Sequence, residues 1–254
     1  MLSFLVLIPL ASIFAYSLHC TIQDYVNLIT NPVIRNAFLT SITCSCIAAA
    51  VNCVFGFLLA WVLVRYDFMG KRLLNGLIEL PFALPTAVAG ITLSKLYSDT
   101  GVLGSFFAAH GISIAYTKIG LTIALVFVGI PFVVRSIQPV LEKLDPSYEE
   151  AGSMLGASSF TIFRKIILPE VCPSLLIGFG LAFSRGLGEY GSVIYIAGNS
   201  AKYHTQVLSY VVMQKLNYVD YASATAIALV MLVIAFSILF ITNLIQLHQA
   251  RRVQ

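Results

Sequence analysis

The chain has 254 residues, of which 59% are hydrophobic and only 10% are charged. A soluble globular domain carries about 25% charged residues, so this composition excludes one and favours a protein that crosses a membrane several times, surrounded by lipid. The formal net charge of +4 comes from 15 basic and 11 acidic residues that form no basic stripe, which excludes nucleic acid as a partner.

Six segments are apolar enough to cross a bilayer. They cover about residues 2–18, 37–64, 75–96, 119–135, 174–197 and 222–244. We therefore predict an all-α integral membrane protein, in which residues 1–254 form a single transmembrane domain of six helices. The chain begins directly in an apolar run without a basic region, so we expect no cleavable presequence.

The third expected span contains two prolines, Pro81 and Pro85. Proline removes a backbone hydrogen bond and kinks a helix. An ordinary kinked helix and a helix that lines or gates a pore both fit this pattern. Both prolines are therefore candidate residues of a translocation path.

The basic residues orient the spans, because lysine and arginine favour the cytoplasmic side. Six spans place both termini on one side. The segments on that side carry nine basic residues and the opposite segments carry five, so we expect both termini in the cytoplasm.

The segment 138–170 is the one long cytoplasmic loop, and it reads as two short helices. Asp145 and Pro146 are typical of a helix start, and Gly156 is a candidate left-handed end to that helix. Ser158 or Ser159 can begin a second amphipathic helix, which we expect Pro169 to stop. Periodicity alone fits equally a knob that docks into a partner and a hairpin that lies on the membrane surface.

The fifth expected span carries two charges, Arg185 and Glu189, which stand one helical turn apart and can pair. Charges at the centre of a span are costly, so they either brace the fold as a neutralised pair or line a path. In the second case Arg185 and the hydroxyls of Ser184 and Ser192 would bind a passing anion. Gly188 lies on a stripe of small residues that also suits helix packing.

The sequence shows no catalytic constellation. The four histidines are scattered without metal-ligand spacing, and the five cysteines include no Cys-x-x-Cys pair. There is no Gly-x-x-x-x-Gly-Lys-Ser/Thr motif, so any ATP that drives this protein must bind a separate chain. We predict that the chain is not an enzyme and binds no metal or cofactor.

The cytoplasmic loop resembles the signature of bacterial ABC importer permeases, which reads Glu-Ala-Ala, three residues, Gly, nine residues and Ile-x-Leu-Pro. The second alanine of the signature is a glycine here. The stretches 80–90, 130–135 and 187–199 narrow the resemblance to sulfate/thiosulfate permeases of the CysT type, and less closely to molybdate permeases. The residues that match or replace the signature are Glu150, Ala151, Gly152, Gly156, Ile166, Leu168 and Pro169.

The resemblance implies a type I importer permease whose loop inserts into an ATPase and couples hydrolysis to transport. It also implies a second homologous permease, an ATPase dimer that uses ATP and Mg, and an external sulfate-binding protein. The substrate would be sulfate or thiosulfate, with molybdate or tungstate as the alternative. The alternative function from another class is a secondary transporter or channel that needs no ATPase. The resemblance implies location in a bacterial inner membrane, with a plastid envelope as the alternative.

Overall fold

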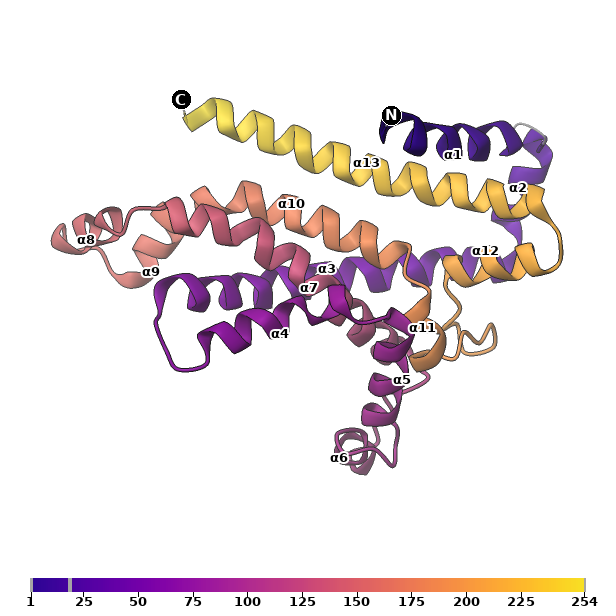
Figure 1. Cartoon of the computed structure of the whole chain (residues 1–254), viewed down its shortest axis with the longest axis horizontal. Coiled ribbons are helices and arrows are strands. Elements are labelled where there is room, and N and C mark those ends of the chain that lie inside the picture. The colour runs from indigo at the N-terminus through magenta and orange to yellow at the C-terminus, as the bar shows by residue number, and fades with distance from the viewer. Residues whose placement is uncertain (1, 18–19, 254) are drawn as a thin grey trace.

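The computed structural model describes residues 2–17 and 20–253, and it is helical throughout this part of the chain apart from turns and connecting loops (Figure 1). The elements are α1 (Leu2–Ser17), α2 (Ile22–Thr30), α3 (Pro32–Arg65), α4 (Lys71–Ala83), α5 (Thr86–Tyr97), α6 (Gly104–Ala109), α7 (Lys118–Lys143), α8 (Ser147–Met154), α9 (Ser159–Ile162), the π-helical turn η1 (Phe163–Ile167), α10 (Leu168–Leu187), α11 (Gly191–Ile196), α12 (Leu208–Asn217) and α13 (Tyr221–Val253).

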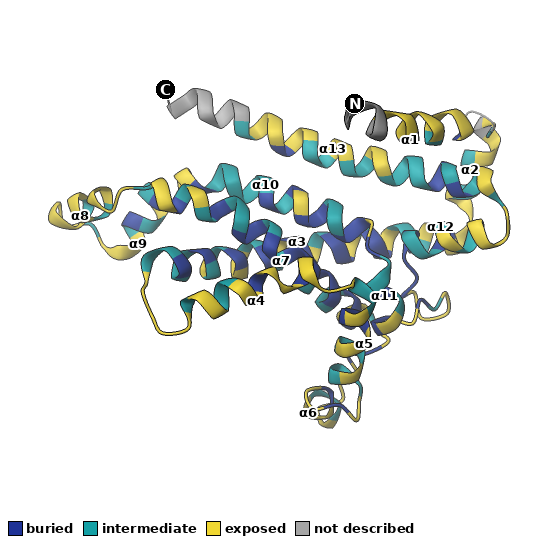
Figure 2. Ribbon diagram, in the orientation of Figure 1, coloured by how far each residue is buried: buried dark blue, intermediate teal, exposed yellow. Residues whose placement is uncertain are grey.

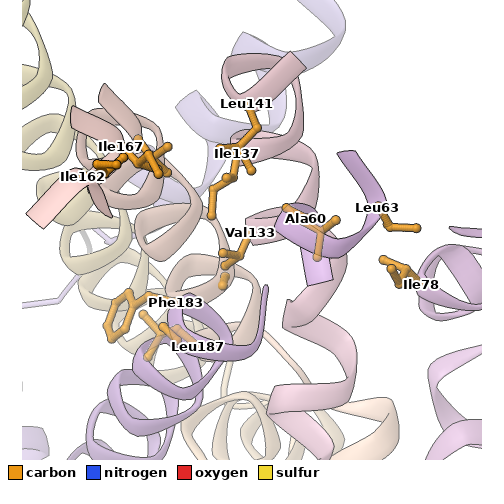
Figure 3. Close-up of a cluster of buried hydrophobic side chains, with 14 residues drawn as sticks. Ala60, Leu63, Ile78, Val133, Ile137, Leu141, Ile162, Ile167, Phe183 and Leu187 are labelled. Carbon is orange, nitrogen blue, oxygen red and sulfur yellow. The ribbon is translucent and has the colours of Figure 1, made fainter. Parts of the chain in front are cut away.

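The core lies where α3, α7 and α10 pack on one another. Figure 2 shows the buried residues gathered on these three helices, whereas α8 and the described part of α1 are mostly exposed. In the close-up of Figure 3, Val133 of α7 lies between the α3 and α10 side chains, with Ala60 on one side and Phe183 on the other. Burial of such side chains is worth about 1.5–3 kcal/mol each in water, but in lipid the close packing itself holds the helices together.

Among the described residues, four helices are long and apolar enough to cross a membrane, and they cover Pro32–Arg65, Lys118–Lys143, Ser159–Leu187 and Tyr221–Gln246. The pair α4 and α5 adds a fifth candidate, bent by 112°. The first expected span corresponds to α1, which has 16 residues and falls short of the roughly 20 that a crossing needs. Its expected last residue, Leu18, lies outside the described residues, so a sixth span stays a prediction.

The bend between α4 and α5 confirms a break at the prolines of the third expected span, and it is sharper than a kink. Pro81 lies inside α4, and Pro85 immediately precedes α5. Leu84 has extended backbone angles, φ −87° and ψ 136°, because the ring of a following proline disfavours the helical region. The 112° turn therefore falls at the residue before Pro85.

Helix α7 runs on to Lys143 and includes Pro139, so the expected loop start at 138 falls within a helix, and the place of that start relative to the membrane stays a prediction. One expected helix end is wrong. Pro169 does not stop the second hairpin helix; it lies in the first turn of α10, where its missing N–H costs nothing and its fixed φ suits a helix. The helix from Ser159 therefore continues without interruption to Leu187.

The fifth expected span, 174–197, is also not one helix. Helix α10 ends at Leu187, and the separate short helix α11 begins at Gly191. The break at residues 188–190 lies next to the two charged residues of this span. The candidate site lies at this break.

Candidate functional site

The two charges of the fifth expected span do pair. Nη1 of Arg185 lies 2.5 Å from Oε2 of Glu189. The Glu189 side chain is 1% exposed whereas the Arg185 side chain is 35% exposed. The carboxylate is therefore sealed inside the protein, while part of the Arg185 side chain stays accessible.

The main chain after the break holds Glu189 in place. Its Oε1 accepts hydrogen bonds from the backbone N–H and the hydroxyl of Ser192, both at 2.9 Å. Its carbonyl oxygen accepts a 2.6 Å hydrogen bond from the Ser209 hydroxyl. Ser192 is fully buried and engaged, so in this conformation it supports Glu189 instead of donating to a passing anion, as the sequence had suggested.

The small residues near the pair do not form one packing stripe. Gly180 does pack closely on α13, against Thr242. A Cβ added at Gly188 would meet only the Ser184 carbonyl, 3.9 Å away, so no helix packs there. The Ser184 hydroxyl is buried without a hydrogen-bond partner. Of the expected path residues at the break, Arg185 and Gly188 are therefore accessible, whereas the Ser184 hydroxyl is buried.

Helix α5 closes against α11 through two glycines. A Cβ on Gly90 would overlap the carbonyl of Ser192, and one on Gly191 would overlap the hydroxyl of Thr86. Thr86 follows Pro85 directly, so the break in the third span is held beside the break in the fifth. Pro81 lies inside α4 and is buried there.

Two polar side chains of α3 face the same interior and were missed in the sequence. Asn52 is fully buried, and both of its amide atoms lack a hydrogen-bond partner; Ser45 is 1% exposed with an unpaired hydroxyl. Both side chains fit between the helices because each lies over a glycine of a neighbouring helix. Asn52 lies over Gly129 of α7, and Ser45 lies over Gly186 of α10. Their spacing of seven residues, which places them on one helix face, was the available signal.

The hairpin, residues 147–167 of α8, α9 and η1, has the predicted two-helix form. Asp145 accepts a 2.9 Å hydrogen bond from the Ser147 N–H, and this bond lowers the pKa of its carboxyl group. Gly156 has φ +79°, which confirms the left-handed corner. The Ala157 N–H donates to the Gly152 carbonyl at 3.0 Å across that corner, which ends α8. Ser158 caps the next helix.

The tip of the hairpin presents apolar side chains to the outside. Met154 and Leu155 are each 89% exposed. The remaining signature residues divide by position: Glu150, Ala151, Gly156, Leu168 and Pro169 are exposed, whereas Gly152 and Ile166 are half-buried and pack on each other. A Cβ on Gly152 would lie 3.1 Å from Ile162, so glycine at this signature position lets the two hairpin helices approach closely.

Two ion pairs join helices at the hairpin end of the bundle. Arg65 at the end of α3 contacts Glu149 of α8 at 2.6 Å and also donates to the Leu144 carbonyl at 3.2 Å. Arg135 of α7 pairs with Glu79 of α4. The hairpin is thereby fixed to α3 through residues 84 positions apart in the sequence.

If the hairpin docks on an ATPase subunit, as the resemblance of its sequence implies, replacing Gly156 with valine should detach that subunit while leaving membrane insertion intact. A Cβ there meets nothing within 4 Å, so any effect comes from the left-handed backbone alone, which costs a β-branched residue about 1–2 kcal/mol. The measurement is the amount of ATPase that co-purifies. Gly156→Asn is the matched control, because asparagine tolerates this conformation; equal loss with both variants would contradict the corner's role.

No group of three or more His, Cys, Asp or Glu that could hold a metal occurs among the described residues. The fold matches that of a bacterial alginate ABC transporter solved with its alginate pentasaccharide-bound periplasmic protein. The TM-score is 0.76 at 18% identity, over 99% of this chain and 91% of that one. The chain thus shares the fold of a chain of that transporter.

The sequence comparisons are more specific. The family described as binding-protein-dependent transport system inner membrane component matches residues 52–254. The chain is 45% identical to the sulfate transport system permease protein CysT of Salmonella typhimurium (strain LT2), over 98% of this chain and 90% of that protein. It is 44% identical to CysT of Escherichia coli (strain K12), over the same shares. The chain belongs to this inner-membrane permease family, and within it to the CysT permeases.

Membership of this family defines the role of the chain in the transporter. It is the non-catalytic, multi-pass inner-membrane component, and ATP hydrolysis belongs to a separate subunit. A binding-protein-dependent ABC system implies an ATPase and a periplasmic binding protein as partners.

Proposed function

We propose that this chain is the permease subunit of an ABC sulfate importer and that Arg185 lies on the translocation path. The observation that carries the path assignment is the asymmetry of the charged pair, with Glu189 buried and Arg185 35% exposed beside the open Gly188. The substrate assignment rests on the near full-length similarity to sulfate permeases.

The geometry suits transient binding of a divalent oxyanion. A guanidinium presents a planar set of N–H donors that matches tetrahedral oxyanions. Glu189 neutralises part of its charge, which weakens the hold on the anion and lets it leave again. Arg185 also lies in the last turn of α10, where a cation is favoured by the helix dipole. The site therefore recognises the oxyanion while binding it weakly enough for release.

The proposal extends to assembly and orientation. Six spans with both termini in the cytoplasm place the hairpin on the side of an ATPase dimer, which uses ATP and Mg, and its exposed apolar tip suits a groove in that partner. A second homologous permease would complete the path, and an external sulfate-binding protein would deliver the anion for alternating access. Thiosulfate is a second substrate of the same shape and charge. The membrane is a bacterial inner membrane, or a plastid envelope.

The decisive experiment is ATP-dependent uptake of labelled sulfate into vesicles that hold the complete transporter. We expect uptake that requires ATPase and binding protein and that thiosulfate competes. Preferential competition by molybdate or tungstate would reassign the substrate. Uptake without the ATPase would favour a secondary transporter or channel instead.

The orientation is tested with a cysteine reagent that does not cross membranes. In sealed cells it should label Cys20 and miss Cys172, which lies near the inner end of α10. Burial raises the pKa of the Cys20 thiol, so labelling should quicken as pH rises and more thiolate forms. Permeabilised cells supply the control for reactivity at both sites, and the reverse pattern in sealed cells would invert the topology.

A further inference from the structure

A pocket of about 250 Å³ lies beside the break in the fifth expected span, between the residue that precedes α11 and one face of α12. It is lined by Tyr190, Tyr210, Met213, Gln214, Asn217 and Tyr218. The lining contains no charged residue, and its polar groups are three phenol hydroxyls and two side-chain amides. None of these six residues belongs to the translocation path proposed above.

One hydrogen bond joins the two sides of the pocket. The Ser209 hydroxyl donates to the Glu189 carbonyl at 2.6 Å. The residue after each of these is a tyrosine, and the rings of Tyr210 and Tyr190 are stacked, with centroids 6.5 Å apart and planes 13° apart. The carboxylate of the same Glu189 pairs with Arg185. A single residue therefore connects the pocket to the proposed path.

The remainder of the pocket is formed by α12 and the residue that follows it. Tyr210, Met213, Gln214 and Asn217 are spaced by three, four and seven positions, which places them on the same side of a helix. Among the described residues, none of the phenol hydroxyls and side-chain amides of the pocket makes a hydrogen bond. These groups thus line one space and are free to bind a ligand there.

We propose that this pocket is a second binding site for the transported oxyanion, on the outer side of Arg185. A sulfate-like dianion carries no proton at neutral pH, so it needs hydrogen-bond donors, which phenol hydroxyls and amide N–H groups supply. Uncharged donors bind such an ion more weakly than a guanidinium does, as a site on a transport path requires. The partly exposed Arg185 side chain, five positions before Tyr190, adds positive charge at the same break and favours an anion over a cation.

The order of the two sites rests on the substrate and the orientation proposed above. Helix α12 belongs to the segment between the fifth and sixth expected spans, which that orientation places on the outer side of the membrane. An anion released by the binding protein then meets this pocket before it reaches Arg185. Two weak sites in succession let an ion enter and leave again.

The test is protection of an introduced thiol in the complete transporter, held in lipid nanodiscs without binding protein. Met213→Cys places the thiol in the pocket, and Leu216→Cys is the matched control on the same helix. The two side chains are similarly exposed, 41% and 37%, and only Met213 lines the pocket. Both variants also carry Cys20→Ser and Cys172→Ser, and mass spectrometry follows the reaction of the introduced thiol with a neutral maleimide.

Sodium sulfate should slow the reaction of Met213→Cys several-fold relative to sodium chloride of equal ionic strength, and should not slow that of Leu216→Cys. Adding Gln214→Glu to Met213→Cys should abolish the protection, because a carboxylate in the pocket repels the dianion. Gln23→Glu adds the same charge to the exposed face of α2 and should leave the protection intact. Tyr190→Phe/Tyr210→Phe keeps both rings and removes two donors, so half-protection should then need several-fold more sulfate.

Equal reaction rates in sulfate and chloride, or protection that survives Gln214→Glu, would overturn the proposal. Failure of Met213→Cys to react at all, or protection by the binding protein without its anion, would assign the pocket to a protein partner and overturn it as well. Protection by molybdate alone would support the pocket while reassigning the substrate. ATP-dependent sulfate uptake without any protection would refute the pocket and leave the proposed function standing.

Discussion

Replacing Arg185 with alanine is expected to lower the yield of folded protein sharply. The change leaves the buried carboxylate of Glu189 with only the two hydrogen bonds from Ser192, and an uncompensated buried charge costs about 3–5 kcal/mol. The double variant Arg185→Met/Glu189→Gln should restore the yield, because glutamine keeps an oxygen that accepts from Ser192 and no charge remains. Size-exclusion chromatography of the solubilised protein measures the folded fraction.

The same double variant separates transport from scaffolding. If Arg185 lies on the path, the assembled transporter should contain normal amounts of this chain yet fail to take up sulfate. The outer pair Lys215–Asp220, at 2.9 Å, supplies the control. Lys215→Met/Asp220→Asn also removes an ion pair and should leave uptake unchanged. Normal uptake by the Arg185→Met/Glu189→Gln transporter would leave the pair a purely structural role.

Gly90→Ala should destabilise the protein even though alanine favours helices. The added Cβ would overlap the backbone of Ser192, so α5 must move away from α11. Displacing α11 removes the support of Glu189, and we expect both folded yield and sulfate uptake to fall by an order of magnitude, in the range typical of overpacking, about 1–3 kcal/mol.

Gly76→Ala is the matched control for that variant, because it lies in the same bent span with open space around it. There alanine should be neutral or stabilise the helix by about 0.5–1 kcal/mol. The two substitutions differ only in what the methyl group meets. Similar effects of both on yield and uptake would show that the α5–α11 contact does not position the site.

The sequence could predict those features that depend on residues close together in the chain. Uncharged stretches of sufficient length identified α3 and α13, and the positive φ of Gly156 followed from its place after an amphipathic turn. The spacing of Arg185 and Glu189 correctly predicted their pairing. In each case the cause lies within a few residues of the effect.

The features that the sequence could not predict depend on contacts between helices that are far apart in the chain. Gly90 matters because it touches Ser192, and Asn52 because it lies over Gly129; both contacts join segments more than 75 positions apart. The end of α10 at Leu187 was missed because the apolar run continues past it. Pro169 was misread because proline both ends helices and begins them, and only the surrounding chain decides between these roles.

The ion pair of Arg65 with Glu149 has a mechanical consequence. It ties the hairpin to the C-terminal end of a 34-residue helix that is itself packed against α7 and α10 along the core. A stiff helix of that length is about 50 Å long at 1.5 Å per residue. A few degrees of tilt imposed at the hairpin would therefore displace the far end of α3 by several ångströms, so with the hairpin docked on the ATPase as proposed, α3 would act as a lever between that partner and the opposite end of the bundle.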